Sequence, residues 1–572
     1  MQIYASPISV PDMRHNKLLD LSFHKWESTY IPSLLNELER MNMTIKSLKE
    51  YEQLSPFEVK NKLIELASKH TDETVLNAGR GNPNWICATP RQAFFTLGQF
   101  AVEESKRRFD FPHAGTHASK ASIAQRFEEY VHRHADAPGI TFLHDAVAYG
   151  IETLGFDPDS WVLELVSGAI GDYYPTPERM LMHVEQVVRN FLIKALCSGQ
   201  IPPGIYDLFA TEGGTAGMRY CFDSLIENKL LHKGDKIALG SPIFAPYLEI
   251  PHINDFGLVT VEIKADPEDD WQYPDSEIDK LKNPSIKAFF VVNPGNPSSK
   301  EIRQSTLDRI AAIVKNNRPD LIILTDDLYG TFVDGFHSLM SIIPSNTLCV
   351  YSFSKHFGCT GWRVAIVALH EDNVLDKMIA ALPESDKKAL IARYASISVD
   401  PTSMTFIDRM VADSRSVALK HTAGLSLPQQ TQMALFALFF MLDASISYIN
   451  GTKEALNARL HDLYQSLGLP IEYDPAATNY YATVDVLSVA RQHYGNEFAK
   501  HLEETYTPLS FVFALAEQKS IVVLPGGGFD APTMSARVSL ANLKDADYVE
   551  MGKRMREVLD AAYDEFRTDR GS

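Results

Sequence analysis

The chain has 572 residues, of which 45% are hydrophobic and 22% charged, and its formal net charge is −19. That length allows more than one domain and a large core. The acidic balance argues against nucleic acid as the main partner. The most apolar run, Met433 to Leu442, is too short to span a bilayer. We therefore expect a cytoplasmic protein that binds neither nucleic acid nor membrane.

The cysteines and histidines show no metal-binding spacing. The five cysteines form no CxxC or CxxxxC pair, and most lie within apolar runs. They are typical of reduced core residues rather than of disulfides or a zinc site. The histidines between residues 110 and 175 lack a tight ligand pattern such as HExxH, so we expect no metal site. Met1 to Pro7 lacks a basic region followed by an apolar one, so a secretory signal is not expected.

Residues 1–50 are predicted to form an N-terminal arm, helical over about 31–49, with no recognisable chemistry. Another helix is predicted from Pro56 to about Ser68, because Ser55 suits the N-cap and proline suits the first helical position. This helix carries Lys60. The following stretch, residues 76–85, contains two glycines and a proline, which indicate a turn where the backbone passes close to another group.

Strands and helices alternate in the middle of the chain. Residues 110–175 show no clear pattern, and an amphipathic helix is predicted over 177–198. Uniformly apolar strands are then predicted over 205–210, 236–239, 258–263, 286–292, 321–325, 348–351 and 364–368. Such strands indicate a sheet that is covered on both faces. We therefore predict an α/β fold with a mostly parallel seven-stranded sheet in a large domain.

The last third is predicted to be helical at first and then mixed. Helices are predicted over 373–382, 386–395, 405–419 and 429–462, and after them a smaller α+β domain with strands over 480–484, 520–524 and 536–540. Its helices are predicted over 490–504, 511–518 and 545–566. The predicted divisions are the arm (1–50), an N-terminal part of the small domain (51–110), the large domain with insertions (111–425) and the C-terminal small domain (426–572).

Small and polar residues follow several predicted strands, and ligands of open α/β sheets bind beyond the strands' carboxyl ends. The strand ends carry Gly213-Gly214-Thr215, the stretch Ser241 to Tyr247, Asn296, Asp326 with Tyr329, and the turn Ser352 to Arg363. In that last turn Lys355 could form an imine with an aldehyde, while Ser352 and Arg363 could hold a phosphate. Gly214 and Thr215 would start a helix, whose exposed N–H groups also bind phosphate.

In this order and spacing, the motifs resemble those of the class I and II aminotransferases, which are fold-type-I pyridoxal 5′-phosphate (PLP) enzymes. The resemblance covers about residues 76–542. It implies that Lys355 bonds covalently to PLP and that Asp326 pairs with the ring nitrogen. It also implies that Asn296 and Tyr329 bond the phenolic oxygen, and that Phe244 stacks on the ring. The implied phosphate ligands are Gly214, Thr215, Ser352, Ser354 and Arg363.

The same resemblance implies a substrate site and a partner subunit. Arg537 fits the family's R-x-S-x-A pattern, whose arginine binds the substrate α-carboxylate through two parallel hydrogen bonds. Gly81 matches the loop glycine that closes over the substrate, and Asn296 is also expected among the substrate-binding residues. Tyr173 or Tyr174 matches a tyrosine that reaches the cofactor phosphate of a partner subunit. The chain would then form a homo-oligomer of dimers with shared active sites.

The length, the insertions and the phrases LNAGRGNPNW and FSKHFGCTGWR resemble the aspartate 4-decarboxylase (aspartate β-decarboxylase) group of this family. This implies conversion of L-aspartate to L-alanine and CO₂ with side aminotransferase activity, in assemblies as large as a dodecamer. The second carboxylate of aspartate would need a cation, for which Arg80 is the first candidate and Lys60 the second. Two alternatives remain: an aspartate or other amino acid aminotransferase, and a PLP-binding regulator, which would need a basic DNA-binding arm.

Overall fold

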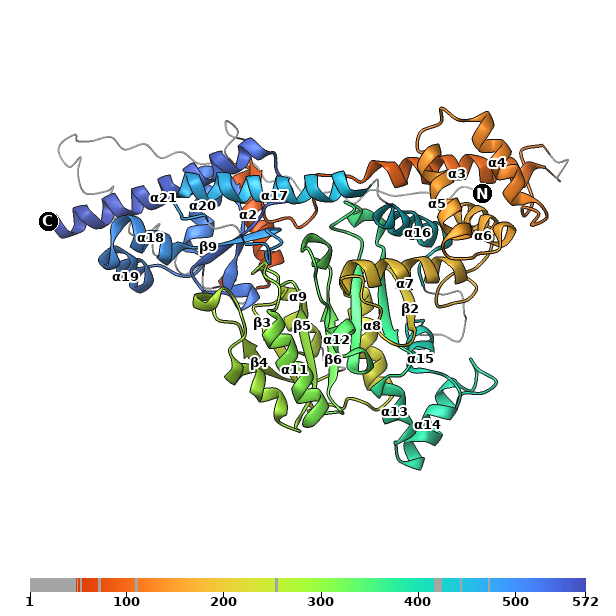
Figure 1. Cartoon of the computed structure of the whole chain (residues 1–572). Coiled ribbons are helices and arrows are strands. Elements are labelled where there is room, and N and C mark those ends of the chain that lie inside the picture. The colour runs from red at the N-terminus through yellow and green to blue at the C-terminus, as the bar shows by residue number, and fades with distance from the viewer. Residues whose placement is uncertain are drawn as a thin grey trace, which may run out of the picture.

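A seven-stranded sheet forms the middle of the molecule (Figure 1). The structure, a computed structural model, describes residues 48, 50–51, 54–69, 74–107, 112–252, 256–415, 424–442, 445–471 and 474–571. Most of the predicted arm, including nearly all of the helix over 31–49, lies outside these ranges.

The strand order of this sheet is β2-β8-β7-β6-β5-β3-β4. The bounds are β2 (Tyr206–Thr211), β3 (Lys236–Ser241), β4 (Val259–Lys264), β5 (Ile286–Val292), β6 (Ile322–Asp326), β7 (Thr347–Ser352) and β8 (Ala365–His370). β8 runs antiparallel to its neighbours β2 and β7, and the other neighbouring pairs are parallel. The predicted α/β fold with a mostly parallel seven-stranded sheet is therefore confirmed.

Both faces of the sheet are covered, which explains why its strands are uniformly apolar. Successive side chains of a strand point to opposite faces. Cys349 and Tyr351 of β7 accordingly join the apolar cluster around helix α7, while Leu348 and Val350 join the cluster around α8. Helices that lie around the sheet are α7 (Met182–Leu196), α8 (Gly214–Glu227), α9 (Ala245–Glu249), α10 (Asp275–Ile278), α11 (Gln304–Asn316), α12 (Leu339–Ile342), α13 (Val374–Ala380), α14 (Glu384–Tyr394) and α15 (Phe406–Asp413).

Three helices form where the sequence showed no clear pattern. They are α4 (Ile123–Arg133), α5 (Ile140–Glu152) and α6 (Pro158–Ile170), and they pack with α3 (Ala88–Lys106) and α16 (Leu427–Met441). Both ends of α6 carry recognisable signals. The Asp157 side chain accepts a hydrogen bond from the Ser160 N–H at 3.0 Å, and Gly171 ends the helix in the left-handed region at φ 71°.

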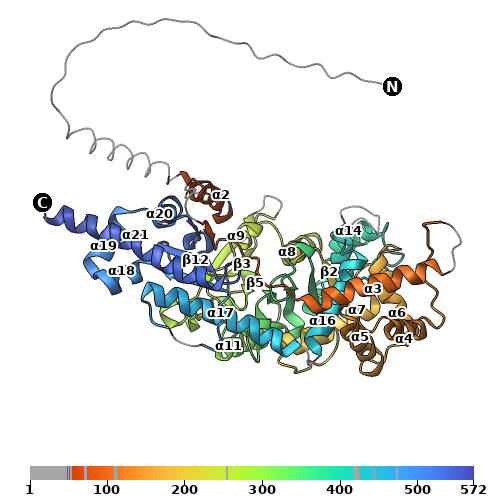
Figure 2. The same cartoon turned by 90° about the horizontal axis from the view of Figure 1, so that it is seen from above.

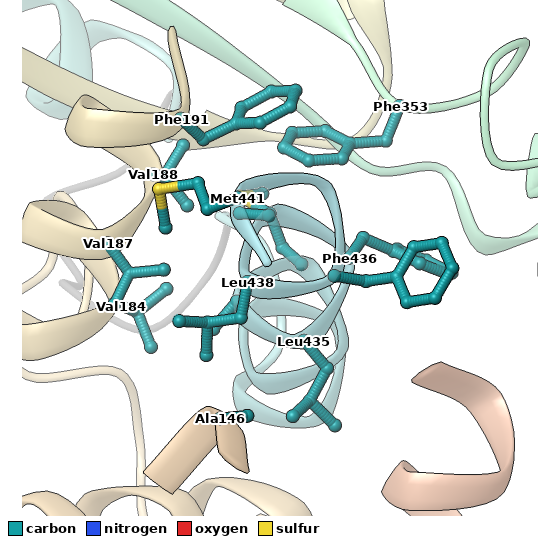
Figure 3. Close-up of a cluster of buried hydrophobic side chains, with 14 of the residues drawn as sticks. Ala146, Val184, Val187, Val188, Phe191, Phe353, Leu435, Phe436, Leu438 and Met441 are labelled. Atoms are coloured by element: carbon teal, nitrogen blue, oxygen red, sulfur yellow. The ribbon is translucent and has the colours of Figure 1, made fainter. Parts of the chain in front are cut away.

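The apolar cluster between α7 and α16 extends to the turn that carries Lys355. Phe353, two residues before the lysine, stacks on Phe191 of α7 with ring centroids 5.3 Å apart (Figure 3). Leu435 and Leu438 of α16 lie in the same cluster. Burial of these large side chains fixes the backbone of the turn, because each buried aromatic or leucine contributes about 1.5–3 kcal/mol.

Two small sheets and five C-terminal helices form a second apolar cluster beside the large sheet (Figures 1 and 2). The antiparallel sheet has the order β11 (Leu524–Pro525), β12 (Ser535–Ser539), β9 (Tyr481–Asp485), and β1 (Leu76–Asn77) pairs with β10 (Ile521–Val522). The helices are α2 (Pro56–Ala67), which joins this cluster from the N-terminal side, α17 (Ile446–Leu467), α18 (Val486–Tyr494), α19 (Asn496–Thr505), α20 (Ser510–Lys519) and α21 (Asp545–Gly571). α17 packs along α21.

Two predicted helices are each broken in two. The prediction over 429–462 is wrong, because Leu442 is extended (ψ 145°) and ends α16, and α17 continues at 88° to it. The prediction over 490–504 is wrong because Gly495 (φ 90°, ψ 169°) separates α18 from α19. Within the described ranges, no single helix is long and apolar enough to cross a membrane, and α16 and α17 reach that threshold only as a bent pair. The division at residues 50, 110 and 425 remains a prediction.

Candidate active site

A cavity of about 190 Å³ lies where the carboxyl ends of the sheet strands face the small antiparallel sheet. Most predicted site residues line it, namely Gly81, Gly214, Thr215, Phe244, Asn296, Asp326, Tyr329, Ser352, Ser354, Lys355, Arg363 and Arg537. The remaining lining residues were not predicted, namely Phe57, Tyr247, Val292, Leu328, Thr360 and Tyr481. The sequence motifs at the strand ends therefore converge on one place.

The amine of Lys355 points into this cavity and donates a hydrogen bond to the Gly81 carbonyl at 2.7 Å. The Trp85 indole N–H donates to the Lys355 carbonyl at 3.1 Å, which holds the backbone of the turn. Burial lowers the pKa of Lys355, the charges of Arg537 and Arg363 lower it further, and neighbouring anionic groups only partly oppose this. A lower pKa leaves more of the amine neutral, as a nucleophile or a base requires.

Asp326 ends β6 and is only 5% exposed. The Tyr247 hydroxyl donates to its Oδ2 at 2.6 Å, and the Leu328 N–H donates to Oδ1 at 3.2 Å. Burial raises the pKa of Asp326 to about 6, although these two hydrogen bonds oppose the shift. Such a carboxylate can hold the proton of a ring nitrogen. The next residue, Asp327, points to the other face and is hydrogen-bonded to Ser338 and Thr325.

An anion cradle forms at the N-terminus of α8. Gly213 has φ 109°, and a Cβ there would lie 1.9 Å from Arg363 Nη2, so only glycine lets the guanidinium approach this helix end. The Ser352 hydroxyl donates to the Ser354 hydroxyl at 3.0 Å on the same side of the cavity. Backbone N–H groups at a helix start, a guanidinium and two hydroxyls are the donors that bind a phosphate. These residues fit the phosphate of PLP.

Arg537 lies in β12 and is 1% exposed. Its Nη1 donates to Asn296 Oδ1 at 3.4 Å and its Nη2 to the Gly79 carbonyl at 3.3 Å, while its Nε has no partner in the described part of the chain. Within those same residues Arg537 forms no ion pair with a carboxylate. A buried guanidinium without a counterion is costly, so this site suits an anionic ligand.

The rings of Tyr481 and Phe529 lie on the Arg537 guanidinium, at 4.3 Å and 4.7 Å from the ring centroids. The register places Arg537 opposite Thr483 of β9, so Tyr481 is its diagonal neighbour on the same face. The Tyr329 hydroxyl donates to the Tyr481 hydroxyl at 3.0 Å. Tyr481 thus links the arginine to the residue that was predicted to bond the cofactor's phenolic oxygen.

Four predicted residues do not line this cavity. Arg80 is exposed, although the carbonyls on either side of it accept hydrogen bonds from Arg537 and Lys355. The Lys60 amine lies 5.5 Å from the ring centroid of Phe57, which does line the cavity. Tyr173 and Tyr174 are 38% and 66% exposed. The roles predicted for these four residues remain predictions.

The two unpredicted tyrosines differ in how visible they were in the sequence. Tyr247 lies three residues after Phe244 in a motif that was recognised, and its buried partner Asp326 was predicted. Tyr481 follows Tyr480 in a short strand with no motif of its own. Only the alternation of side chains along β9 could have indicated that one of them faces the site.

The five cysteines are buried and free, as predicted. Within the part of the chain that the structure covers, no group of three or more His, Cys, Asp or Glu side chains could hold a metal ion. The donors of the site are instead an amine, a carboxylate and an anion cradle.

Solved structures share this fold. The aspartate aminotransferase of Thermus thermophilus with maleate aligns with a TM-score of 0.53 and 18% identity, covering 88% of this chain and 96% of that one. The aspartate aminotransferase of Thermotoga maritima aligns with a TM-score of 0.54 and 16% identity, covering 89% and 97%. The fold is therefore that of the aminotransferase class of PLP enzymes.

Sequence comparisons identify the family. The model of aminotransferase class I and II matches residues 210–554. A protein from Pseudomonas sp., described as a bifunctional aspartate aminotransferase and L-aspartate beta-decarboxylase, is 47% identical over 524 residues, covering 91% of this chain and 99% of the relative. The chain belongs to the class I and II aminotransferases, which are PLP-dependent enzymes, and the predicted resemblance is confirmed.

Proposed function

We propose that this enzyme removes the β-carboxylate of L-aspartate, giving L-alanine and CO₂, with aminotransferase activity as a side reaction. The observation that carries the proposal is the 47% identity to the Pseudomonas protein, which extends over 99% of that protein. The alignment covers 91% of this chain, so the similarity is not confined to one part of it.

The residues that would hold PLP all line the same cavity. Lys355 would bond to it covalently, Asp326 would hold a proton at its ring nitrogen, and Phe244 would stack on its ring. Asn296 and Tyr329 would bond its phenolic oxygen. The phosphate would lie among Gly214, Thr215, Ser352, Ser354 and Arg363. When bound, PLP supplies an electron sink for the carbanionic character that develops on the substrate.

The substrate would lie between Arg537 and Lys355. Arg537 would release the Gly79 carbonyl and bind the α-carboxylate with two parallel hydrogen bonds. The Lys355 amine would then remove the proton from Cα, for which its lowered pKa is suited. We propose Arg80, and Lys60 after it, as the cation that receives the β-carboxylate when the loop around Gly81 closes.

We also propose a cytoplasmic homo-oligomer built from dimers with shared active sites, in assemblies as large as a dodecamer. Tyr173 and Tyr174 support the sharing, because both are exposed and both lie away from the cavity of their own chain. In a dimer they would approach the cofactor phosphate of the partner subunit.

The rival function is a plain aspartate aminotransferase. The purified enzyme with PLP and L-aspartate, but without a keto acid, separates the two. We expect alanine and CO₂ in equal amounts over many turnovers, measured by chromatography and CO₂ trapping. L-glutamate, which is one methylene longer, is the matched control and should release no CO₂. A single half-turnover that leaves the amino form of the cofactor would establish the aminotransferase instead.

A further inference from the structure

We propose that Tyr481 is the acid that delivers the proton to Cβ of the substrate when the β-carboxylate leaves as CO₂. The inference rests on the proposed function and assigns a role to a residue that no sequence motif indicated. It makes Tyr481 a catalytic residue, separate from Lys355, which serves Cα.

The position of the Tyr481 hydroxyl supports this role. The side chain is 4% exposed and lines the cavity. A Cβ placed on Gly81 would lie 2.8 Å from Tyr481 Oη and 3.1 Å from Lys355 Nζ, so the hydroxyl and the amine face the same small volume. The ring of the same tyrosine lies 4.3 Å from the Arg537 guanidinium. A substrate anchored at Arg537 and at Lys355 would therefore pass its carbon chain beside this hydroxyl.

The hydroxyl protons of the other two phenols that line the cavity are used in hydrogen bonds to other groups. Tyr247 donates its proton to Asp326, and burial holds the pKa of this phenol well above its ordinary value. Tyr329 donates its proton to Tyr481, and with PLP bound it would donate it to the phenolic oxygen instead. The serines and threonines of the lining lie among the predicted phosphate ligands or near Arg363, and aliphatic hydroxyls are much weaker acids than a phenol. Among the described residues that line the cavity, Tyr481 is thus the phenol with a proton to donate to the substrate.

The surroundings of Tyr481 favour the phenolate that remains after donation. The titratable and charged groups that face it are Lys355, Arg537, Tyr329 and Tyr480. Burial alone would raise the pKa of Tyr481, but the charges of Lys355 and Arg537 and the hydrogen bond from Tyr329 outweigh it and lower that pKa. The acid is therefore both buried and stronger than an ordinary phenol, as proton transfer near neutral pH requires.

The step balances without a further reactant. The Cβ–Cγ bond breaks, CO₂ leaves, and the electron pair of that bond takes the Tyr481 proton to form a new Cβ–H bond. The phenolate lies against the Arg537 guanidinium and regains a proton from solvent after the product leaves. One proton is taken up for each CO₂ released.

The test uses the PLP-loaded full chain and its Tyr481→Phe variant, with Tyr206→Phe as the control. Tyr206 is also a buried tyrosine with one hydroxyl hydrogen bond, to the Met340 carbonyl, but it lies in β2 away from the cavity. Aspartate carrying one stereospecific β-deuterium is converted in tritiated water, and the configuration of the resulting chiral methyl group of alanine is determined. Alanine formation by Tyr481→Phe should fall by about 10²–10⁴-fold, and its methyl group should lose its single configuration.

These experiments distinguish a failure of the role of Tyr481 from a failure of the proposed function. Alanine of one methyl configuration, formed by Tyr481→Phe at the wild-type rate, overturns the role of Tyr481 alone. Absence of CO₂ release from the wild-type enzyme overturns both proposals. A readout without cofactor is the ultraviolet titration of the apoenzyme. It should show one tyrosine ionising below the ordinary range, absent in Tyr481→Phe and shifted to higher pH in Tyr329→Phe. An unchanged titration in both variants contradicts the inference.

Discussion

On one wall of the cavity, Asp326 and Ser352 are the last residues of the sheet strands β6 and β7, and Lys355 lies in the turn after β7. On the other wall, Arg537 and Tyr481 lie within the antiparallel strands β12 and β9. The sheet wall holds its groups through a backbone fixed on both faces by apolar clusters. The small-sheet wall holds its groups through ring stacking and bonds to loop carbonyls.

This difference indicates that the two walls have different roles, one for the cofactor and one for the substrate. The groups of the sheet wall are the ones that fit PLP, and they are fixed before any ligand arrives, which is how a cofactor site gains affinity. On the small-sheet wall, Arg537 donates to the Gly79 carbonyl, a bond that an incoming carboxylate can replace. We therefore expect changes on the sheet wall to affect the cofactor, and changes on the small-sheet wall to affect the substrate.

The largest expected effect comes from Lys355→Ala on the sheet wall. Because the amine is both the covalent attachment point and the base at Cα in our proposal, turnover should fall by about 10⁴-fold or more. The visible absorbance of covalently held PLP should also disappear, as measured after dialysis. The control is Lys500→Ala, whose side chain is 72% exposed and does not line the cavity. Retention of the visible band in Lys355→Ala would place the attachment on another lysine.

Arg537→Lys on the small-sheet wall should have the next largest effect. Lysine keeps the charge but cannot form two parallel hydrogen bonds, and one charge-assisted bond is worth about 1.5–3 kcal/mol. The kcat/KM for aspartate should therefore fall roughly 100-fold, while the absorbance of bound PLP stays unchanged.

The control for this variant is Arg318→Lys. Arg318 is also a buried arginine, and its Nε donates to Asp320 at 2.9 Å. It does not line the cavity, so this variant should lower Tm and leave kcat/KM unchanged. Loss of bound PLP in Arg537→Lys would refute the division between the walls.

The smallest expected effect is a pH dependence of stability in the apoenzyme. Burial raises the pKa of Asp326 to about 6, so ionising this group costs more in the folded chain than in the unfolded one. Its contribution to stability is therefore full below the unfolded pKa and is lost as the pH rises through the folded pKa. Between about pH 4 and pH 7 this loss amounts to roughly 1–3 kcal/mol.

Asp326→Asn should remove that part of the dependence. The measurement is urea unfolding of both apoenzymes across this pH range, with the exposed Asp564→Asn as the control. Equal pH dependence in wild type and Asp326→Asn would show that the carboxyl does not titrate in this range.

Much of the sheet wall could be predicted from the sequence, because the ends of parallel strands meet at one edge and short motifs mark them. Lys355, Asp326 and Asn296 were found in this way. Tyr481 could not be found in this way, because its approach to Arg537 depends on the register between β9 and β12, which are more than 50 residues apart. Phe57 reaches the cavity from α2, nearly 500 residues before Arg537.

The sequence also predicted only some of the helices and their ends correctly. The start and stop signals of α6 were present at Asp157 and Gly171 but were not recognised. The break after Leu442 carries no proline or glycine, and the apolar pattern continues through it. Met441 before the break and Tyr448 after it both pack in the cluster around α7, and these contacts between distant segments are not visible in the local sequence.

Helix α17 connects the two walls. Near its start, the Tyr448 hydroxyl donates to the carbonyl of His356, the residue after Lys355, at 2.6 Å. Further along, Arg459 donates to the Leu540 carbonyl at 3.0 Å, three residues beyond Arg537. These two attachments are eleven residues apart, about 16 Å along a rigid helix. The helix thus fixes the separation between the two backbone segments that carry the amine and the guanidinium. The length of substrate that fits therefore depends on a structural element outside the cavity.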